Sequence, residues 1–192
     1  MLKIFHKIQL SFLLIISLTL LCSFLILTSI SQAAELQFKG GSIKMPANPK
    51  EYKEDDIDLP WGKATQENYE AKNPATDIIY HFATFTFSNP TKTLNLSGLR
   101  KVKKFFLKNR GCVATTLKED VFLDANKHAW PQTTFEGVCK APVRFQITVL
   151  IAENQVFWFE VYRNGISGIR LEKGYLTKTL NDFISSFILK SN

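Results

Sequence analysis

Two adjacent segments in the C-terminal half of the chain constrain its fold most. Between residues 143 and 151 apolar positions alternate with others, and Glu153 and Asn154 then form a turn before an aromatic-rich segment at 155–162. The alternating apolar positions are Val143, Phe145, Ile147, Val149 and Ile151. A period of two puts this row on one face of a strand, and a two-residue turn brings the chain back beside it. The pattern predicts an antiparallel hairpin with one buried face.

Other segments rich in β-branched and aromatic residues predict further strands. They lie at residues 36–45, 63–69, 78–87, 113–117, 133–138 and 166–171. Residues 48–63 differ, because this stretch holds two prolines and several acidic side chains. We expect a long surface loop there, and long loops within compact domains often carry function.

Two amphipathic helices are expected beside the strands. The first begins at Ser97, which can cap it, and ends at Gly111, where a left-handed residue suits glycine. The second covers residues 176–189, where an apolar stripe recurs every three or four residues. Each apolar stripe must pack against another layer. The predicted fold class is therefore α+β: a mainly antiparallel sheet with two amphipathic helices packed on it, and one disulfide.

The N-terminal segment has the order of a secretory signal. Lysines precede an apolar run at residues 10–30, and small residues follow it. This order predicts a signal peptide at residues 1–33, cleaved after Ala33. The alternative is an uncleaved anchor, because at ~1.5 Å per residue the run can cross a hydrocarbon core of roughly 30 Å. The rest, residues 34–192, is expected to form a single domain that is periplasmic or secreted, or that is anchored to the inner membrane.

This domain contains two cysteines, Cys112 and Cys139. In an oxidising compartment an even pair favours a disulfide, and neither a CxxC spacing nor a histidine cluster marks them as metal ligands or a redox pair. We predict the bridge Cys112–Cys139, with no metal and no cofactor. Its ring contains His128 and Trp130, so reduction is expected to loosen that loop first.

The densest charge cluster lies on the first expected helix. Arg100, Lys104 and Lys108 recur every four residues and share one helix face, within a chain of formal net charge +7. This stripe predicts contact with an anionic lipid, an acidic polymer or an envelope protein. A solvated helix face is the alternative. Nucleic acid is not expected as a partner, because the basic residues are not interleaved with exposed aromatics.

Trp61 and Trp130 each stand next to a proline in an expected loop. Such tryptophans either pin a loop to the body of the domain or present an apolar surface to a ligand. We count both among the candidate binding residues, together with Arg100, Lys104 and Lys108.

No catalytic residue is assigned. His81 lies in an expected strand, where a hydrogen-bonded structural ring is the usual finding, and His128 lies in an expected exposed loop. The sequence shows no Ser-His-acid order, nucleophile elbow, phosphate-binding glycine loop or HExxH spacing. A hydrolase-like enzyme remains an alternative, because catalytic groups also assemble from distant positions.

The order of the elements resembles the PsbP-like α/β sandwich. The resemblance rests on a short strand leading into Pro-x-x-Pro at residues 46–49, on the hairpin at 143–162 and on the C-terminal helix at 176–189. It covers residues 40–190. It implies a binding or accessory role and transfers no catalytic residue.

These features together predict an exported binding or accessory domain of the cell envelope that contacts an anionic or protein partner. One alternative is an enzyme whose site has no recognisable motif. Another is a membrane-tethered subunit of an envelope complex, which would retain the apolar run at residues 10–30.

Overall fold

The computed structural model describes residues 33–89, 94–95, 97–101, 107, 111–124, 126–139, 143–164 and 174–190. The expected signal peptide or anchor, the strand at 166–171, Lys104 and Lys108 lie outside these residues. Ala33–Asn192 forms one compact unit. None of the helices described there combines the length and apolar character that a membrane crossing requires.

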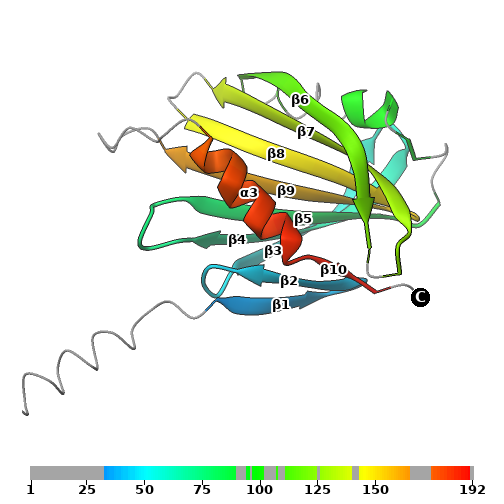
Figure 1. Ribbon diagram of the computed structural model, residues 1–192. Coiled ribbons are helices and arrows are strands. Elements are labelled where there is room, and N and C mark those ends of the chain that lie inside the picture. The colour runs from blue at the N-terminus through cyan, green and yellow to red at the C-terminus, as the bar shows by residue number, and fades with distance from the viewer. Residues whose placement is uncertain are drawn as a thin grey trace, which may run out of the picture. The chain divides into compact units, whose positions relative to one another are not determined.

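The main layer is a seven-stranded sheet with the order β3-β4-β5-β9-β8-β7-β6 (Figure 1). Its strands are β3 (Lys50–Leu59), β4 (Gly62–Lys72), β5 (Ile79–Phe87), β6 (Cys112–Leu123), β7 (Ala129–Cys139), β8 (Val143–Ala152) and β9 (Gln155–Asn164). All neighbours run antiparallel. The predicted hairpin is confirmed as β8 and β9, the third and fourth strands from the β6 edge.

A second, three-stranded sheet has the order β1-β2-β10. It consists of β1 (Ala34–Phe38), β2 (Gly41–Met45) and β10 (Ile188–Leu189), and the helix α3 (Tyr175–Ser185) precedes β10. Figure 1 shows α3 lying across one face of the large sheet, next to the small one. A second helical segment includes residues 97–101 and 107. The predicted fold class is confirmed: mostly antiparallel sheets, two helices and one disulfide.

The expected loop at residues 48–63 is wrong, because β3 occupies most of it and turns at Pro60 into β4. β3 is an edge strand with a bulge between Glu54 and Ile57, and most of its side chains are exposed. An exposed edge strand needs no apolar alternation, and charges along it oppose pairing with other chains. The acidic composition therefore suits this strand.

Both expected helix boundaries shift in the structure. Asn95, not Ser97, caps the first helical segment, since its Oδ1 accepts the Gly98 N–H at 2.9 Å. The C-terminal helix ends at Ser185 rather than at residue 189, and the chain continues into β10. The apolar pattern continues past the helix because Phe187 and Leu189 stay buried in the same core as α3.

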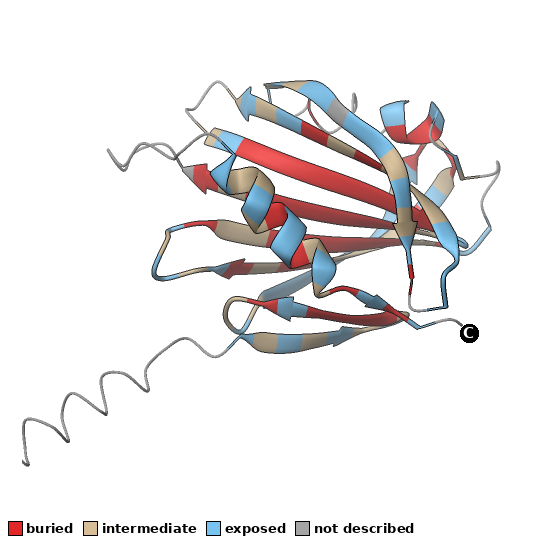
Figure 2. Cartoon of the chain, viewed as in Figure 1, coloured by how far each residue is buried: buried red, intermediate tan, exposed pale blue. Residues whose placement is uncertain are grey.

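The large sheet has a core on each face, and the central strands carry most of the buried residues (Figure 2). We call the side that α3 and the small sheet cover the α3 face; its core includes the buried residues Phe82, Phe157, Phe159, Phe183 and Phe187. The other side is the opposite face, where helical residues Leu99 and Leu107 pack with Trp61 and Phe87 over part of the sheet.

Candidate functional site

Only one residue of the expected basic stripe lies among the described residues. Arg100 is exposed, and its Nε and Nη2 donate to the two carboxylate oxygens of Glu119 on β6 at 2.9 and 2.7 Å. The hydrogen bonds and charge of Glu119 raise the pKa of the Arg100 guanidinium. Glu119 therefore offsets the positive charge that Arg100 would add to the stripe.

Trp61 lies in the core rather than on a binding surface, with 2% of its surface exposed. Its ring meets Phe87 edge-on, with centroids 5.9 Å apart. A Cβ added to Gly98 would come within 2.1 Å of the indole, so only glycine lets the helix approach this closely. The interpretation in which the tryptophan pins the chain to the body is the correct one for Trp61.

Trp130 is the second residue of strand β7 and is half-buried against the α3-face core. Its Nε1 donates to Asp124 Oδ2 at 3.0 Å, and His128 Nδ1 lies 3.2 Å from the same oxygen. The Trp130 hydrogen bond, with backbone and His128 bonds, lowers the pKa of Asp124. Trp130 thus helps to order the turn between β6 and β7. His128 is exposed there, as expected.

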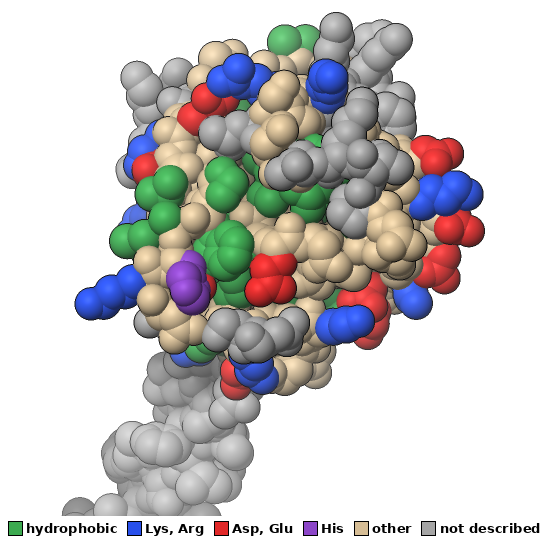
Figure 3. Space-filling view, turned by 90° about the vertical axis from the view of Figure 1, so that its right-hand side faces the viewer, with side chains coloured by type: hydrophobic (Ala, Val, Ile, Leu, Met, Phe, Trp, Pro, Cys, Tyr) green, Lys and Arg blue, Asp and Glu red, His purple; other side chains and the backbone are tan. Residues whose placement is uncertain are grey.

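Apolar side chains are exposed where β6 ends, among them Val121 and Leu123. Figure 3 views the molecule from this end and shows hydrophobic side chains gathered between charged ones.

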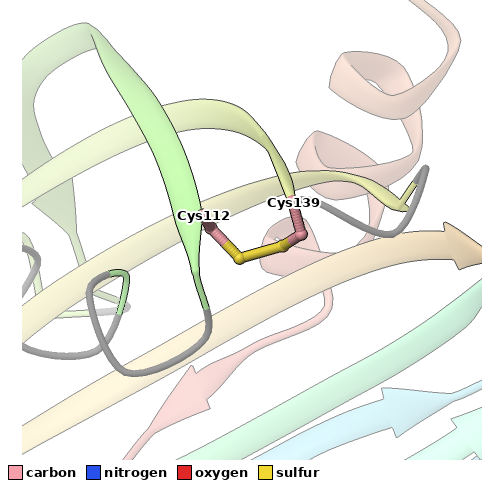
Figure 4. Close-up of a disulfide and its surroundings, with 2 residues drawn as sticks. All are labelled: Cys112 and Cys139. Atoms are coloured by element: carbon pink, nitrogen blue, oxygen red, sulfur yellow. A yellow bond between two sulfur atoms is a disulfide. The ribbon is translucent and has the colours of Figure 1, made fainter.

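The predicted disulfide is confirmed between Cys112 and Cys139 (Figure 4). The two cysteines are direct cross-strand partners at the open end of the β6–β7 hairpin. The turn with His128 and Trp130 lies at the other end of this paired ladder. The expectation that reduction would loosen that turn first therefore has no basis in the structure, because the whole length of the hairpin separates the two.

A cavity of about 210 Å³, which no sequence pattern predicts, lies on the opposite face beyond the part covered by Trp61 and the helical segment. Its lining comes from six neighbouring strands and includes Tyr52, Glu70, His81, Cys139, Val143, Phe145, Glu160 and Tyr162. We call it the sheet pocket. A Cβ on Gly137 would lie 2.4 Å from Phe145 Cζ, so glycine allows the Phe145 ring to lie over β7.

A buried polar row lies in and beside this pocket. His81 and Glu160 face each other across β5 and β9, with 5% and 2% of their surfaces exposed. His81 Nδ1 lies 3.3 Å from Glu160 Oε2, and that oxygen also accepts the Trp158 Nε1–H at 3.1 Å. His81 Nε2 lies 3.1 Å from Asn68 Oδ1. The expectation of a strand histidine with a hydrogen-bonded ring is confirmed.

The His81–Glu160 pair is bonded within the protein on both sides. Asn68 Oδ1 accepts from the Gln66 amide and also lies beside His81 Nε2. Glu160 Oε2 faces both His81 Nδ1 and the Trp158 indole N–H. Both side chains of the pair therefore have partners inside the protein.

The row also contains an unsatisfied group. Asn68 is 0% exposed, and its Nδ2 has no hydrogen-bond partner among the described residues. Leaving a buried donor unpaired costs on the order of 1–3 kcal/mol. Stability alone does not account for such a row.

Glu70 differs from Glu160 in its surroundings. Glu70 Oε2 accepts the Tyr162 hydroxyl at 2.7 Å, which holds the phenol ring against the pocket. Lys50 is the direct cross-strand neighbour of Glu70, yet no ion pair joins the two in the described structure. Glu70 is thus a carboxylate of the pocket wall that no bonded cation offsets.

One sequence signal could have pointed to this site. Glu160 is the single acidic residue inside the apolar and aromatic strand β9. A charged side chain in such a strand is buried only when it is paired. What the sequence could not show is that β4 and β5 bring Glu70 and His81 beside it, because those pairings join residues far apart in the chain.

The described residues contain no cluster of three or more potential metal-ligating side chains. Among the described lining residues of the pocket there is also no serine, threonine or free thiol, because Cys139 is bonded to Cys112. The chemistry present is that of carboxylates, an imidazole, two phenols and apolar groups.

Comparison with solved structures finds chains with a similar fold. The chain is similar to the solution structure of cyanobacterial PsbP (CyanoP) from Synechocystis sp. PCC 6803, with 11% identity, a TM-score of 0.48, and coverage of 84% of this chain and 96% of that one. This agrees with the PsbP-like resemblance and concerns the fold alone. No family model matches the chain, and no curated protein matches it significantly.

Proposed function

We propose that this protein is an exported, non-enzymatic binding or accessory domain of the cell envelope, and that the sheet pocket is its binding site. The observation that carries the proposal is the buried His81–Glu160 pair in the pocket wall. Buried ion pairs seldom stabilise a fold more than apolar residues of the same volume would. A binding role accounts for a polar row placed within an otherwise apolar sheet.

Two features favour binding over catalysis. Both ring nitrogens of His81 already face acceptors, so the ring is held rather than available as a base. The described pocket wall also contains no serine or threonine, and its one cysteine, Cys139, is bonded to Cys112 and is not a free nucleophile. Export is supported by the disulfide, because such bonds persist in oxidising compartments.

A pocket-filling variant tests the binding role. Val143→Trp adds bulk at the pocket wall, whereas Val138→Trp makes the same change at an exposed β7 position on the α3-face side. The protein purified from envelope fractions would be used to capture ligands or partners from envelope extract. We expect a species that wild type and Val138→Trp both retain and that Val143→Trp loses.

Equal capture by Val143→Trp would overturn the proposed site, provided that its melting temperature shows that it folds. If it does not fold, Tyr162→Phe, which removes one hydroxyl from the wall, takes its place. A parallel panel of ester, glycoside and phosphate substrates tests the alternative: turnover that Val143→Trp abolishes would make the protein a hydrolase.

The intact mass of the protein from fractionated cells tests export. We expect an N-terminus at Ala34 and recovery in the soluble envelope fraction. The full-length chain in the membrane pellet would instead favour the membrane-tethered subunit.

A further inference from the structure

We infer that the sheet pocket receives a positively charged amino or guanidino group, so that its ligand belongs to the class of organic cations. The group would come from a small amine or from a lysine or arginine side chain of a partner. The inference rests on the proposed function, because it names the ligand class of the same site.

The size of the pocket limits the ligand. At about 210 Å³ the pocket is smaller than the roughly 300–1,000 Å³ of pockets that bury drug-sized ligands. That volume holds one group the size of a side chain. It does not hold a folded segment or a lipid chain.

The charge of the pocket wall determines the sign of the charge that we expect on the ligand. Glu160 faces His81 and the Trp158 indole N–H, whereas no ion pair joins Glu70 to a cation among the described residues, so the described pocket wall is acidic. No lysine or arginine is among the described lining residues. One oxygen of Glu70 receives the Tyr162 hydroxyl, which orients the carboxylate toward the rest of the wall.

The aromatic rings of the pocket wall also suit a cationic ligand. Tyr52, Phe145 and Tyr162 line the same cavity as Glu70, and Tyr52 is 53% exposed. A cation over an aromatic face is attracted by the ring quadrupole, and a carboxylate beside it adds a direct charge contact. Ammonium and guanidinium groups satisfy both at once. A neutral polyol would hydrogen-bond to the carboxylate of Glu70 but would not neutralise the charge of that carboxylate.

Lys50 allows the sign of the ligand's charge to be tested. It is exposed and lies directly across from Glu70, on the same face of the sheet. Its ammonium repels a cation at the pocket and attracts an anion. Removing Glu70 and removing Lys50 should therefore change affinity in opposite directions if the ligand is charged, and only a cation gives a loss for Glu70 and a gain for Lys50.

The experiment uses the full protein and two probes, n-butylammonium and N-acetyl-arginine amide, with n-pentanol and glucose as neutral comparisons. Binding is followed by the chemical shifts of backbone amides on β4, β5, β8 and β9. We expect saturable shifts with the cations and none with the neutral compounds. Shifts with both cations place the recognition in the charged group itself, whereas shifts with the arginine derivative alone would assign the ligand to a partner side chain.

Three charge variants decide the sign. Glu70→Gln should weaken cation binding at least tenfold, and Lys50→Gln should strengthen it about twofold to fivefold. Glu67→Gln is the matched control, because Glu67 lies on the same strand but on the α3 face beside Tyr69, and it should change affinity less than twofold.

Several results would overturn the inference: equal binding of the neutral compounds, no shift with either cation, or weaker binding in Lys50→Gln. None of these would remove the proposed function if Val143→Trp still loses its captured species. If Val143→Trp captures that species normally, the proposed site fails whatever the probes do.

Discussion

The two faces of the large sheet use the same strands for different purposes. On β9, Phe157 and Phe159 point into the α3-face core, while Trp158 and Glu160 between and beside them belong to the opposite face. β5 repeats the contrast with Phe82 and His81. Alternate residues of one strand thus build a closed aromatic core on one side and a polar row on the other.

The two faces differ in how completely the surface of the sheet is packed. On the α3 face, Phe82 packs against several rings, including Phe157 at a centroid distance of 6.4 Å and Phe187 at 6.1 Å. On the opposite face, part of the sheet borders a cavity whose wall includes the buried His81–Glu160 pair. Both faces therefore contribute a buried core, and the proposed site lies on the face that also holds the cavity.

The largest expected effect is on the α3 face. Phe82→Ala removes a ring that is 0% exposed, and we expect a loss of about 3–5 kcal/mol in the free energy of unfolding. Urea unfolding measures it. Val138→Ala, at a side chain 50% exposed, serves as the control and should change stability by less than about 0.5 kcal/mol. A loss below about 1 kcal/mol for Phe82→Ala would break the contrast between the faces.

Loss of the disulfide should rank next. The cysteines are 27 residues apart, for which chain entropy gives about 3.5 kcal/mol. In the double variant Cys112→Ser/Cys139→Ser, amide exchange should rise first beside the sheet pocket, because Cys139 lines it. The turn at Asp124 should keep its protection. Earlier exchange at that turn would contradict this order, and two free thiols in the native, unreduced protein would refute the bridge.

A smaller effect is expected from the polar row. Glu160→Gln leaves Trp158 and His81 with a neutral partner of similar shape, and we expect a loss of about 1–3 kcal/mol. Denaturant unfolding at neutral pH tests this. A gain in stability would show that the Glu160 carboxylate destabilises the fold. A loss as large as that of Phe82→Ala would remove the contrast between the faces.

The stability contributed by the turn between strands β6 and β7 should depend on pH. Hydrogen bonds, first of all from Trp130, lower the pKa of Asp124 in the folded state. Its contribution to stability is therefore present above the unfolded pKa of about 3.9 and is lost as pH falls through the lower folded value. The stability difference between wild type and Asp124→Asn should shrink below about pH 4. A difference that persists to lower pH would contradict the assignment.

The smallest effect is expected at the basic stripe. Replacing Arg100, Lys104 and Lys108 with Gln should leave the melting temperature nearly unchanged and lower salt-dependent binding to anionic vesicles. Arg100→Gln alone should contribute least, because Glu119 already offsets that charge. Vesicle binding that the triple replacement does not alter would mean that the stripe is only a solvated helix face.

Patterns that lie within one segment could be predicted from the sequence. The hairpin of β8 and β9, the disulfide and the α+β class all follow from local alternation, turn residues or an even cysteine pair. The edge strand β3 could not, because strand pairing there depends on its neighbour β4 rather than on apolar alternation. Trp61 lies in the turn between β3 and β4 as expected, but its burial depends on contacts with Phe87 and Gly98, which are distant in the chain.

The pocket could not be predicted because no single segment contains it. Glu70, His81 and Glu160 are register neighbours on β4, β5 and β9, so they meet only after the sheet has formed. Taken alone, each of these three residues resembles an ordinary polar residue in a strand. Their shared face follows from strand register, which is set by pairing across distant parts of the chain.

The small sheet has a consequence for how the protein is made. β2 lies between β1, its immediate neighbour in sequence, and β10, which comes from near the other end of the described chain. A chain that emerges N-terminus first exposes β1 and β2 long before β10 exists, so this sheet can be completed only after nearly all of the domain has been released. During that interval one edge of β2 is open. Translation or translocation that stalls just before residue 188 would therefore leave a nearly complete fold in which one edge of β2 is unpaired and open to pairing with another chain.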